Sequence, residues 1–139
     1  MEISVIRKRL TETIERAKKQ AAERRGRSDQ ASRDFEVFLQ KIGVPLFRQI
    51  ANALKADGYA FTVFTPSGSV RMMSDRSSDD FIELSLDAAE DPPQVMAHVS
   101  RTRGRRVLDA ERPVGAPEAL TEEELLTFVL KELEAFVER

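Results

Sequence analysis

The sequence predicts an α+β fold in which N-terminal helices and a C-terminal helix flank an antiparallel β-meander of four or five strands. Apolar residues recur every three or four positions through residues 3–54, alternate with polar residues from Tyr59 to about Val107, and return to helical spacing after Thr121. Helices grouped at both ends of a run of strands are typical of an α+β domain, with the last helix packed on one sheet face.

The composition is that of one folded domain. The chain has 139 residues, of which 41% are hydrophobic and 33% charged, a globular balance. It contains no cysteine, which excludes disulfides, thiolate nucleophiles and cysteine-type zinc sites. The longest apolar run is three residues, far below the roughly 20 that a membrane-spanning helix needs. Arg7, Lys8 and Arg9 stand where a secretory signal would be apolar. We therefore expect a cytoplasmic protein.

Residues 1–27 predict a basic amphipathic helix. Its apolar side is a narrow stripe of residues spaced three or four apart: Ile3, Ile6, Leu10, Ile14, Ala17 and Ala21. Residues 1–35 carry ten Lys/Arg and six Asp/Glu, a balance of +4, whereas the rest of the chain carries twelve and eighteen, a balance of −6. The two parts are therefore expected to face different surroundings.

A kinked helix is predicted over residues 29–57. The stretch from Gly26 to Asp29 interrupts the first pattern and offers capping side chains, so we expect a break there, with the α+β domain spanning residues 28–139. A broader apolar face follows, made of Phe35, Phe38, Leu39, Ile42, Leu46, Ile50, Ala53 and Leu54. Pro45 lacks an amide donor and predicts the kink.

Residues 59–111 predict the meander. Alternation is clearest from Ile82 to Leu86, with one face solvated, and a proline–glycine turn at residues 65–68 joins the first two strands. Residues 94–103 are open to two interpretations, since Asp-Pro-Pro before them and a glycine after them also suit a helix. The alternation within this segment favours a strand.

The C-terminal part predicts a linker and then a helix. Residues 112–120 contain two prolines and a glycine, which favour irregular structure. Thr121 and Glu124 have the spacing of a capping box, in which each side chain bonds the other's backbone N–H at a helix start. A helix is therefore predicted over residues 121–138, with an apolar stripe that covers the sheet.

Few residues suggest catalysis. The single histidine, His98, is expected on the sheet face opposite Val95, Ala97 and Val99, as a half-exposed structural side chain. The acidic loop at residues 75–80 lacks the spacing of a calcium loop, and no glycine-rich phosphate loop occurs. The sequence therefore predicts no catalytic residue, no metal site and no cofactor, and favours a protein that is not an enzyme.

An arginine-rich hairpin tip is the sharpest candidate for ligand binding. Arg101, Arg103, Arg105 and Arg106 surround Gly104 at a predicted turn, and guanidinium groups bind phosphates or carboxylates bidentately. Nucleic acid is less favoured because the loop has no aromatic side chain for stacking and the pI is about 5.6. Pairing of these arginines with the protein's own acids is an equally good interpretation.

Three functions follow from these features. The leading hypothesis is a non-enzymatic protein–protein interaction or adaptor module that self-associates through the stripe of residues 3–21, because a seam ending in alanines buries little alone. The first alternative is binding of an anionic ligand or nucleic acid by the arginine hairpin and the basic first helix. The second is a small-molecule carrier with a sheet–helix cavity lined by Met72, Met73 and Met96. No membrane partner is expected, since the first helix has no tryptophan or phenylalanine.

Overall fold

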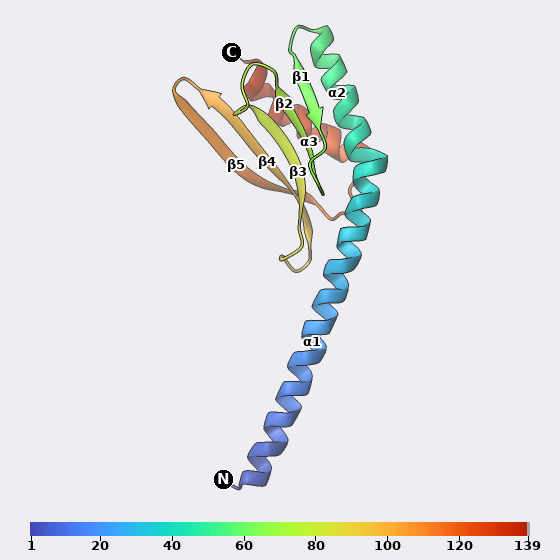
Figure 1. Cartoon of the computed structure of the whole chain (residues 1–139), viewed down its shortest axis with the longest axis vertical. Helices are drawn as coiled ribbons and strands as arrows, with labels where there is room; N and C mark the ends of the chain where they lie inside the picture. Colours follow the sequence, from blue (N-terminus) through green and yellow to red (C-terminus); the bar gives the residue numbers. More distant parts are fainter. Residues whose placement is uncertain (139) are drawn as a thin grey trace.

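In the computed structural model, which describes residues 1–138, a sheet and the helices that pack on it form an α+β body, and one long helix projects from this body (Figure 1). This confirms the predicted fold class. The elements, in chain order, are α1 (Ile3–Phe38), the π-helical turn η1 (Leu39–Gly43), α2 (Val44–Ala56), β1 (Phe61–Phe64), β2 (Val70–Ser74), β3 (Phe81–Asp87), β4 (Gln94–Arg103), β5 (Arg106–Gly115) and α3 (Glu122–Val137).

The five strands form one antiparallel meander in the order β1-β2-β3-β4-β5. Residues 94–103 are a strand: Val99 of β4 lies opposite Ile82 of β3 on one side and opposite Ala110 of β5 on the other. The helical interpretation of this segment is therefore wrong, because the segment pairs with strands along both edges.

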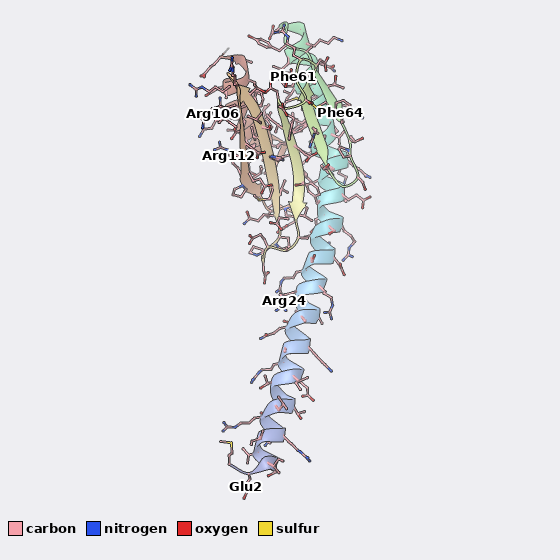
Figure 2. All side chains as sticks on the ribbon, turned by 60° about the vertical axis from the view of Figure 1, so that its left-hand side comes forward. Glu2, Arg24, Phe61, Phe64, Arg106 and Arg112 are labelled. Atoms are coloured by element: carbon pink, nitrogen blue, oxygen red, sulfur yellow. The ribbon has the colours of Figure 1, made fainter. Side chains whose placement is uncertain are left out.

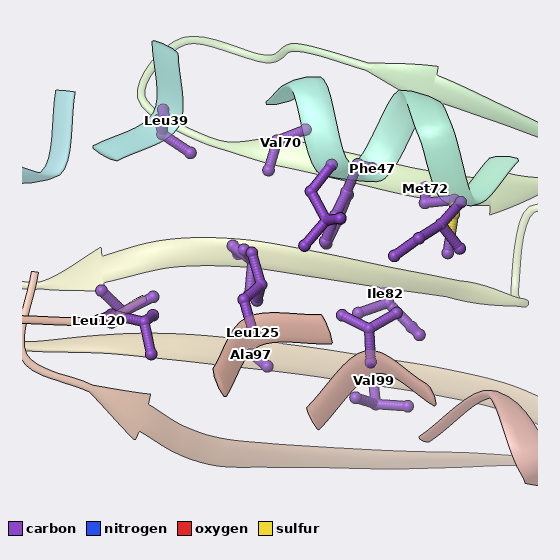
Figure 3. Packing of buried hydrophobic residues seen from close by; sticks show 14 of the residues in the cluster. Leu39, Phe47, Val70, Met72, Ile82, Ala97, Val99, Leu120 and Leu125 are labelled. Carbon is purple, nitrogen blue, oxygen red and sulfur yellow. The ribbon is translucent and has the colours of Figure 1, made fainter. Parts of the chain in front are cut away.

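The core lies between one sheet face and the helices (Figure 3). Because successive strand residues point to opposite faces, Val70, Met72, Ile82, Leu84, Val95, Ala97 and Val99 share this face, and all are buried. They meet buried side chains of α2 and α3, among which Phe47 and Leu125 are fully enclosed. The same alternation points the intervening residues, such as Glu83 and His98, to the opposite sheet face, which we call the open face.

The expected break at Gly26 to Asp29 is wrong, because α1 continues through these residues to Phe38. One glycine inside a helix costs only about 1 kcal/mol relative to alanine. The burial of Ala31, Phe35 and Phe38 against the body offsets that cost. The expected boundary between residues 27 and 28 thus lies within one uninterrupted helix.

The predicted kink near Pro45 takes the form of a π-helical turn. The N–H of Val44 bonds the carbonyl of Leu39, five residues earlier, and Pro45, which has no N–H to donate to the preceding turn, follows at the start of α2. The apolar face therefore continues from α1 into α2, with Phe35 and Phe47 in the same core cluster.

The predicted linker at residues 112–120 is partly wrong, because Arg112 to Gly115 belong to β5. Pro113 is tolerated because β5 is an edge strand, where a residue without an N–H need not interrupt a ladder on both sides. The register shifts between Val95 and Met96, close to where Pro113 pairs. Only the part after Gly115 is irregular before α3.

The predicted capping box at the start of α3 is confirmed. The N–H of Glu124 donates to Thr121 Oγ1 at 3.2 Å, and the N–H of Thr121 donates to Glu124 Oε1 at 3.2 Å. Both bonds satisfy amides that the first helical turn leaves without a backbone partner. The helix begins and ends within one residue of the predicted bounds at 121 and 138.

Candidate functional site

The predicted apolar stripe of α1 lies in solvent. We call residues 3–23 the arm; at 1.5 Å per residue it is about 31 Å long. Figure 2 shows its side chains, between the labelled Glu2 and Arg24, pointing away from the helix without meeting the body. The exposed fractions of the large stripe residues are 68% for Ile3, 48% for Ile6, 56% for Leu10 and 44% for Ile14. The arm therefore presents an apolar stripe that its own body does not cover.

The stripe keeps to one side of the helix. Its members follow one another in steps of 3, 4, 4, 3 and 4 residues, so five steps cover 18 residues and average 3.6, the period of a straight α-helix. The fifth large apolar residue of the arm, Val5, lies on the opposite side. A partner that follows the helix axis can therefore contact the stripe along its whole length.

The stripe is nearly aligned with the face by which α1 packs on the body. At 100° per residue, the mean direction of the six stripe residues lies about 60° from that of the buried Ala31, Phe35 and Phe38. The body therefore lies on the same side of α1 as the stripe, beyond the C-terminal end of the arm. This limits how a second molecule can lie along the stripe.

The C-terminal end of the arm lies next to the point where the β3–β4 loop, residues 88–93, contacts α1. Arg27 donates to Asp91 through both Nε and Nη2, at 3.2 and 3.0 Å. Residues Arg24 and Arg27 also border a small hollow with Ala88 and Pro93. The loop thus contacts α1 just beyond the last stripe residue, Ala21.

Basic side chains flank the stripe. On the helical wheel Arg7, Lys18 and Arg25 follow one edge of the stripe and Arg24 lies in line with Ile6. The far side is mixed, with Lys8, Arg16 and Lys19 among the acids Glu12, Glu15 and Glu23. Residues 1–27 carry nine Lys/Arg and four Asp/Glu, a net charge of +5. Because the whole chain has a net charge of −2, the other residues together carry −7. The sequence contains this distribution, but it becomes visible only when each residue is placed around the helix at 100° per residue.

The four predicted anion-binding arginines lie together at the β4–β5 tip. Arg103 pairs with Arg106 across the turn, and Arg101, two residues before Arg103, shares its sheet face. Gly104 closes the turn with a positive φ of 64°, which favours glycine. Arg101 and Arg103 border an open hollow of about 410 Å³ beside Ala135 and Glu138 at the end of α3. Within residues 1–138 none of the four arginines forms an ion pair.

The arginine tip and the arm lie at opposite ends of the molecule (Figures 1 and 2). Asp91, which contacts Arg27 of α1, precedes the first residue of β4, whereas the arginine tip lies at the other end of this strand. A ten-residue strand is about 33 Å long. The hairpin and the first helix, which one hypothesis combined for anion binding, are therefore two separate basic surfaces.

The open face carries a cluster that the sequence pattern did not reveal. His98 Nε2 lies 2.7 Å from Asp109 Oδ1, and its ring meets Phe81 edge-on at a centroid distance of 5.0 Å. The guanidinium of Arg71 lies 3.9 Å above the Phe81 ring and donates to Glu83 at 3.0 Å. The predicted half-exposed position of His98 is confirmed, at 30% exposure of its side chain. Strand alternation predicts the face, but only the register brings these five residues together.

The acidic loop at residues 75–80 also has a structural role. Asp80 is 2% exposed, and its Oδ1 accepts from the N–H of Thr102 at 2.6 Å. Asp75 accepts from the Thr62 hydroxyl at 2.6 Å. In the described part of the chain no group of three or more histidine and acidic residues has the geometry of a metal site.

The three methionines of the carrier hypothesis do not line one cavity. Met72 is fully buried in the core, whereas Met73 and Met96 point to the open face. A hollow of about 650 Å³ lies instead between the α1–η1 region and the β1–β2 turn. Its lining is mixed, with Ser32, Glu36, Gln40 and Ser85 beside Phe35 and Leu86.

No protein-family model, curated protein or solved structure matches this chain. Its class is therefore defined by the fold itself, an α+β domain with a projecting amphipathic arm. Among residues 1–138 no helix has the length and apolar content to cross a membrane.

Proposed function

We propose that this protein is a non-enzymatic interaction module that self-associates through the arm. The observation that carries the proposal is the exposure of Ile3, Ile6, Leu10 and Ile14, between 44% and 68%, on one side of a helix that its own body leaves uncovered. Apolar side chains gain free energy when they leave water, in proportion to the area removed. A second copy of the stripe supplies a matching apolar surface of the same length.

An isolated arm has little reason to be helical on its own. Single helices of this length are marginal in water, and most helical stability in proteins comes from packing of the apolar side. The arm has only three alanines, Ala17, Ala21 and Ala22, and no body contact over its length. A partner that packs on the stripe therefore also stabilises the helical conformation of the arm.

The size of the stripe sets the expected strength. A strip about 31 Å long and about 10 Å wide on each of two helices covers roughly 600 Å² in total, which falls among weak, reversible interfaces. We expect a dimer with a dissociation constant of roughly 1 to 100 µM. The basic edges of the stripe are expected to weaken self-association at low salt.

Sedimentation velocity of the full chain tests the proposal with a matched pair of variants. The double variant Ile6→Glu/Leu10→Glu places two carboxylates in the stripe, and Val5→Glu makes the same kind of change on the opposite side of the helix. The double variant should remain monomeric at concentrations where the native chain and Val5→Glu dimerise. Equal dimerisation of all three would exclude the stripe as the contact.

A second candidate function is anion binding at the β4–β5 tip. It is supported by Arg101, Arg103 and Arg106, which share one sheet face and form no ion pair within the described residues. Like charges opposite each other on paired strands destabilise a hairpin unless an anion lies between them. The tip therefore suits a phosphate or carboxylate group.

Calorimetric titration with inorganic pyrophosphate and with a short single-stranded oligonucleotide at low salt tests this candidate. The variant Arg103→Gln/Arg106→Gln should lose binding, and Arg7→Gln/Arg9→Gln, which removes equal charge from the arm, should retain it. Equal loss in both variants would show a nonspecific charge effect. No binding by the native chain would contradict the candidate directly.

A further inference from the structure

We infer that two arms pair in antiparallel orientation, with residue i of one chain opposite residue 27 − i of the other. This inference rests on the proposed self-association and specifies the contact between the copies. The partner is a second copy of the chain because Ile6 and Leu10 meet Ala21 and Ala17 of that copy in this orientation.

The sizes of the stripe residues favour this register. The large side chains occupy the first part of the stripe and the alanines occupy the last part. In the antiparallel register Ile6 faces Ala21 of the second copy and Leu10 faces Ala17. These two large side chains then lie opposite small ones, which favours an even separation of the helices at these levels, whereas Ile3 faces Arg24 and Ile14 faces Thr13. The two-fold axis passes between Thr13 and Ile14.

A parallel, in-register pair matches less well. It would place Leu10 against Leu10 and Ile14 against Ile14 at one end, and Ala17 against Ala17 and Ala21 against Ala21 at the other. The large pairs need a wider separation of the axes than the small pairs. The helices would have to converge toward the body.

The body itself also opposes the parallel pair. The stripe and the body-packing residues Ala31, Phe35 and Phe38 point within about 60° of each other around α1. A parallel partner helix lying on the stripe side would therefore continue into space that the first chain's own sheet occupies. In the antiparallel pair the partner helix meets α1 only along residues 3–24, before the body begins.

Charge opposes this orientation at one edge of the stripe. Arg9 is the residue that the register places opposite Lys18 of the second copy, and Arg7 lies two positions from it on the same edge as Lys18. Glu2, the extended N-cap residue before α1, comes level with Arg25 of the second copy but does not lie on that edge. The orientation thus brings one like-charge pair together, twice by symmetry.

Disulfide trapping in the full chain separates this inference from the proposed function, since the chain has no cysteine of its own. Three single-cysteine variants are each oxidised alone: Leu10→Cys, Ala17→Cys and Ile14→Cys. An equimolar mixture of Leu10→Cys and Ala17→Cys is oxidised in the same way. Ile14 lies next to the two-fold axis of the antiparallel pair and faces itself in the parallel pair, so it links the chains in either orientation. A disulfide needs Cα atoms within about 7 Å.

The inference predicts that Ile14→Cys forms a linked dimer and that the mixture of Leu10→Cys with Ala17→Cys links at least about tenfold faster than either variant alone. Glu12→Cys, on the far side of the arm, measures random collision. Rapid linking of Leu10→Cys and of Ala17→Cys with themselves, without the mixed product, would show a parallel pair and overturn this inference alone. Failure of Ile14→Cys to exceed Glu12→Cys would overturn the proposed self-association as well.

Discussion

Arg27 of α1 and Asp91 of the β3–β4 loop form a two-point ion pair, with Nε–Oδ1 at 3.2 Å and Nη2–Oδ2 at 3.0 Å. The pair joins residues 64 positions apart and lies just beyond the arm. Both side chains are about half exposed, at 49% and 54%, so the pair contributes at most about 1 kcal/mol to global stability. The pair lies where the free part of the helix meets the body.

Asp91→Asn should therefore change local order more than stability. We expect a shift of under about 1 kcal/mol in the free energy of unfolding, together with faster amide hydrogen exchange at residues 22–28. Urea denaturation and hydrogen exchange measure the two effects. Glu90→Gln, a neighbouring change of equal charge, is the control. Unchanged exchange in Asp91→Asn would show that the ion pair does not hold the helix to the loop.

Phe47→Ala should strongly destabilise the body. Phe47 has no exposed surface and lies in the cluster between α2 and the sheet, so truncation removes buried area and leaves a cavity. We expect a loss of about 3–5 kcal/mol in urea denaturation. Phe64→Ala, at a position 43% exposed on edge strand β1, should cost much less. Equal losses would be inconsistent with a core confined to the helix-covered face.

Thr121→Ala should reduce stability by about 1 kcal/mol, because it removes the acceptor for the N–H of Glu124 and leaves the Glu124 side chain without its partner hydroxyl. Thr127→Ala, at an exposed position within α3, should be neutral or slightly stabilising, since alanine has the higher helix propensity. Thermal denaturation compares the two. A larger loss in Thr127→Ala would contradict the capping account.

Salt should strengthen dimerisation of the native chain, because the stripe has basic edges and salt screens their mutual repulsion. In the antiparallel register Lys18 comes opposite Arg9 and near Arg7 of the second copy, so Lys18→Glu replaces repulsion by attraction at two places. We expect tighter association, by about two- to tenfold at low salt, with a smaller response to added salt. Sedimentation at two salt concentrations measures this change.

Lys19→Glu is the matched control for the salt prediction, since it makes the same charge change on the far side of the arm. It should alter association much less than Lys18→Glu does. Weaker association in Lys18→Glu than in the native chain would contradict the antiparallel register. An equal gain in both variants would assign the effect to net charge rather than to the contact.

Local patterns predicted the elements well where one physical cause dominates. The capping box at Thr121 depends on four neighbouring residues, and the alternation from Ile82 to Leu86 depends on one solvated face, so both follow directly from the sequence. The break at Gly26 was predicted wrongly because tertiary contacts of Phe35 and Phe38 outweigh one unfavourable residue. The end of β5 was missed because an edge strand tolerates Pro113.

The surfaces were predicted less completely than the elements. The stripe and the arginine tip were found from spacing alone, and the structure places both in solvent. Their separation could not be predicted, since it depends on which end of β4 meets α1. The pairing of His98 with Asp109 likewise depends on the β4–β5 register, which the positions of apolar residues do not specify at an open face.

Sedimentation equilibrium of the full native chain, from about 1 to 500 µM at moderate salt, tests the central claim most directly. Self-association through the arm predicts a weight-average mass that rises with concentration from 15.7 kDa toward twice that value, and that stays at the monomer mass in Ile6→Glu/Leu10→Glu. A native chain that remains at 15.7 kDa throughout this range would contradict the account.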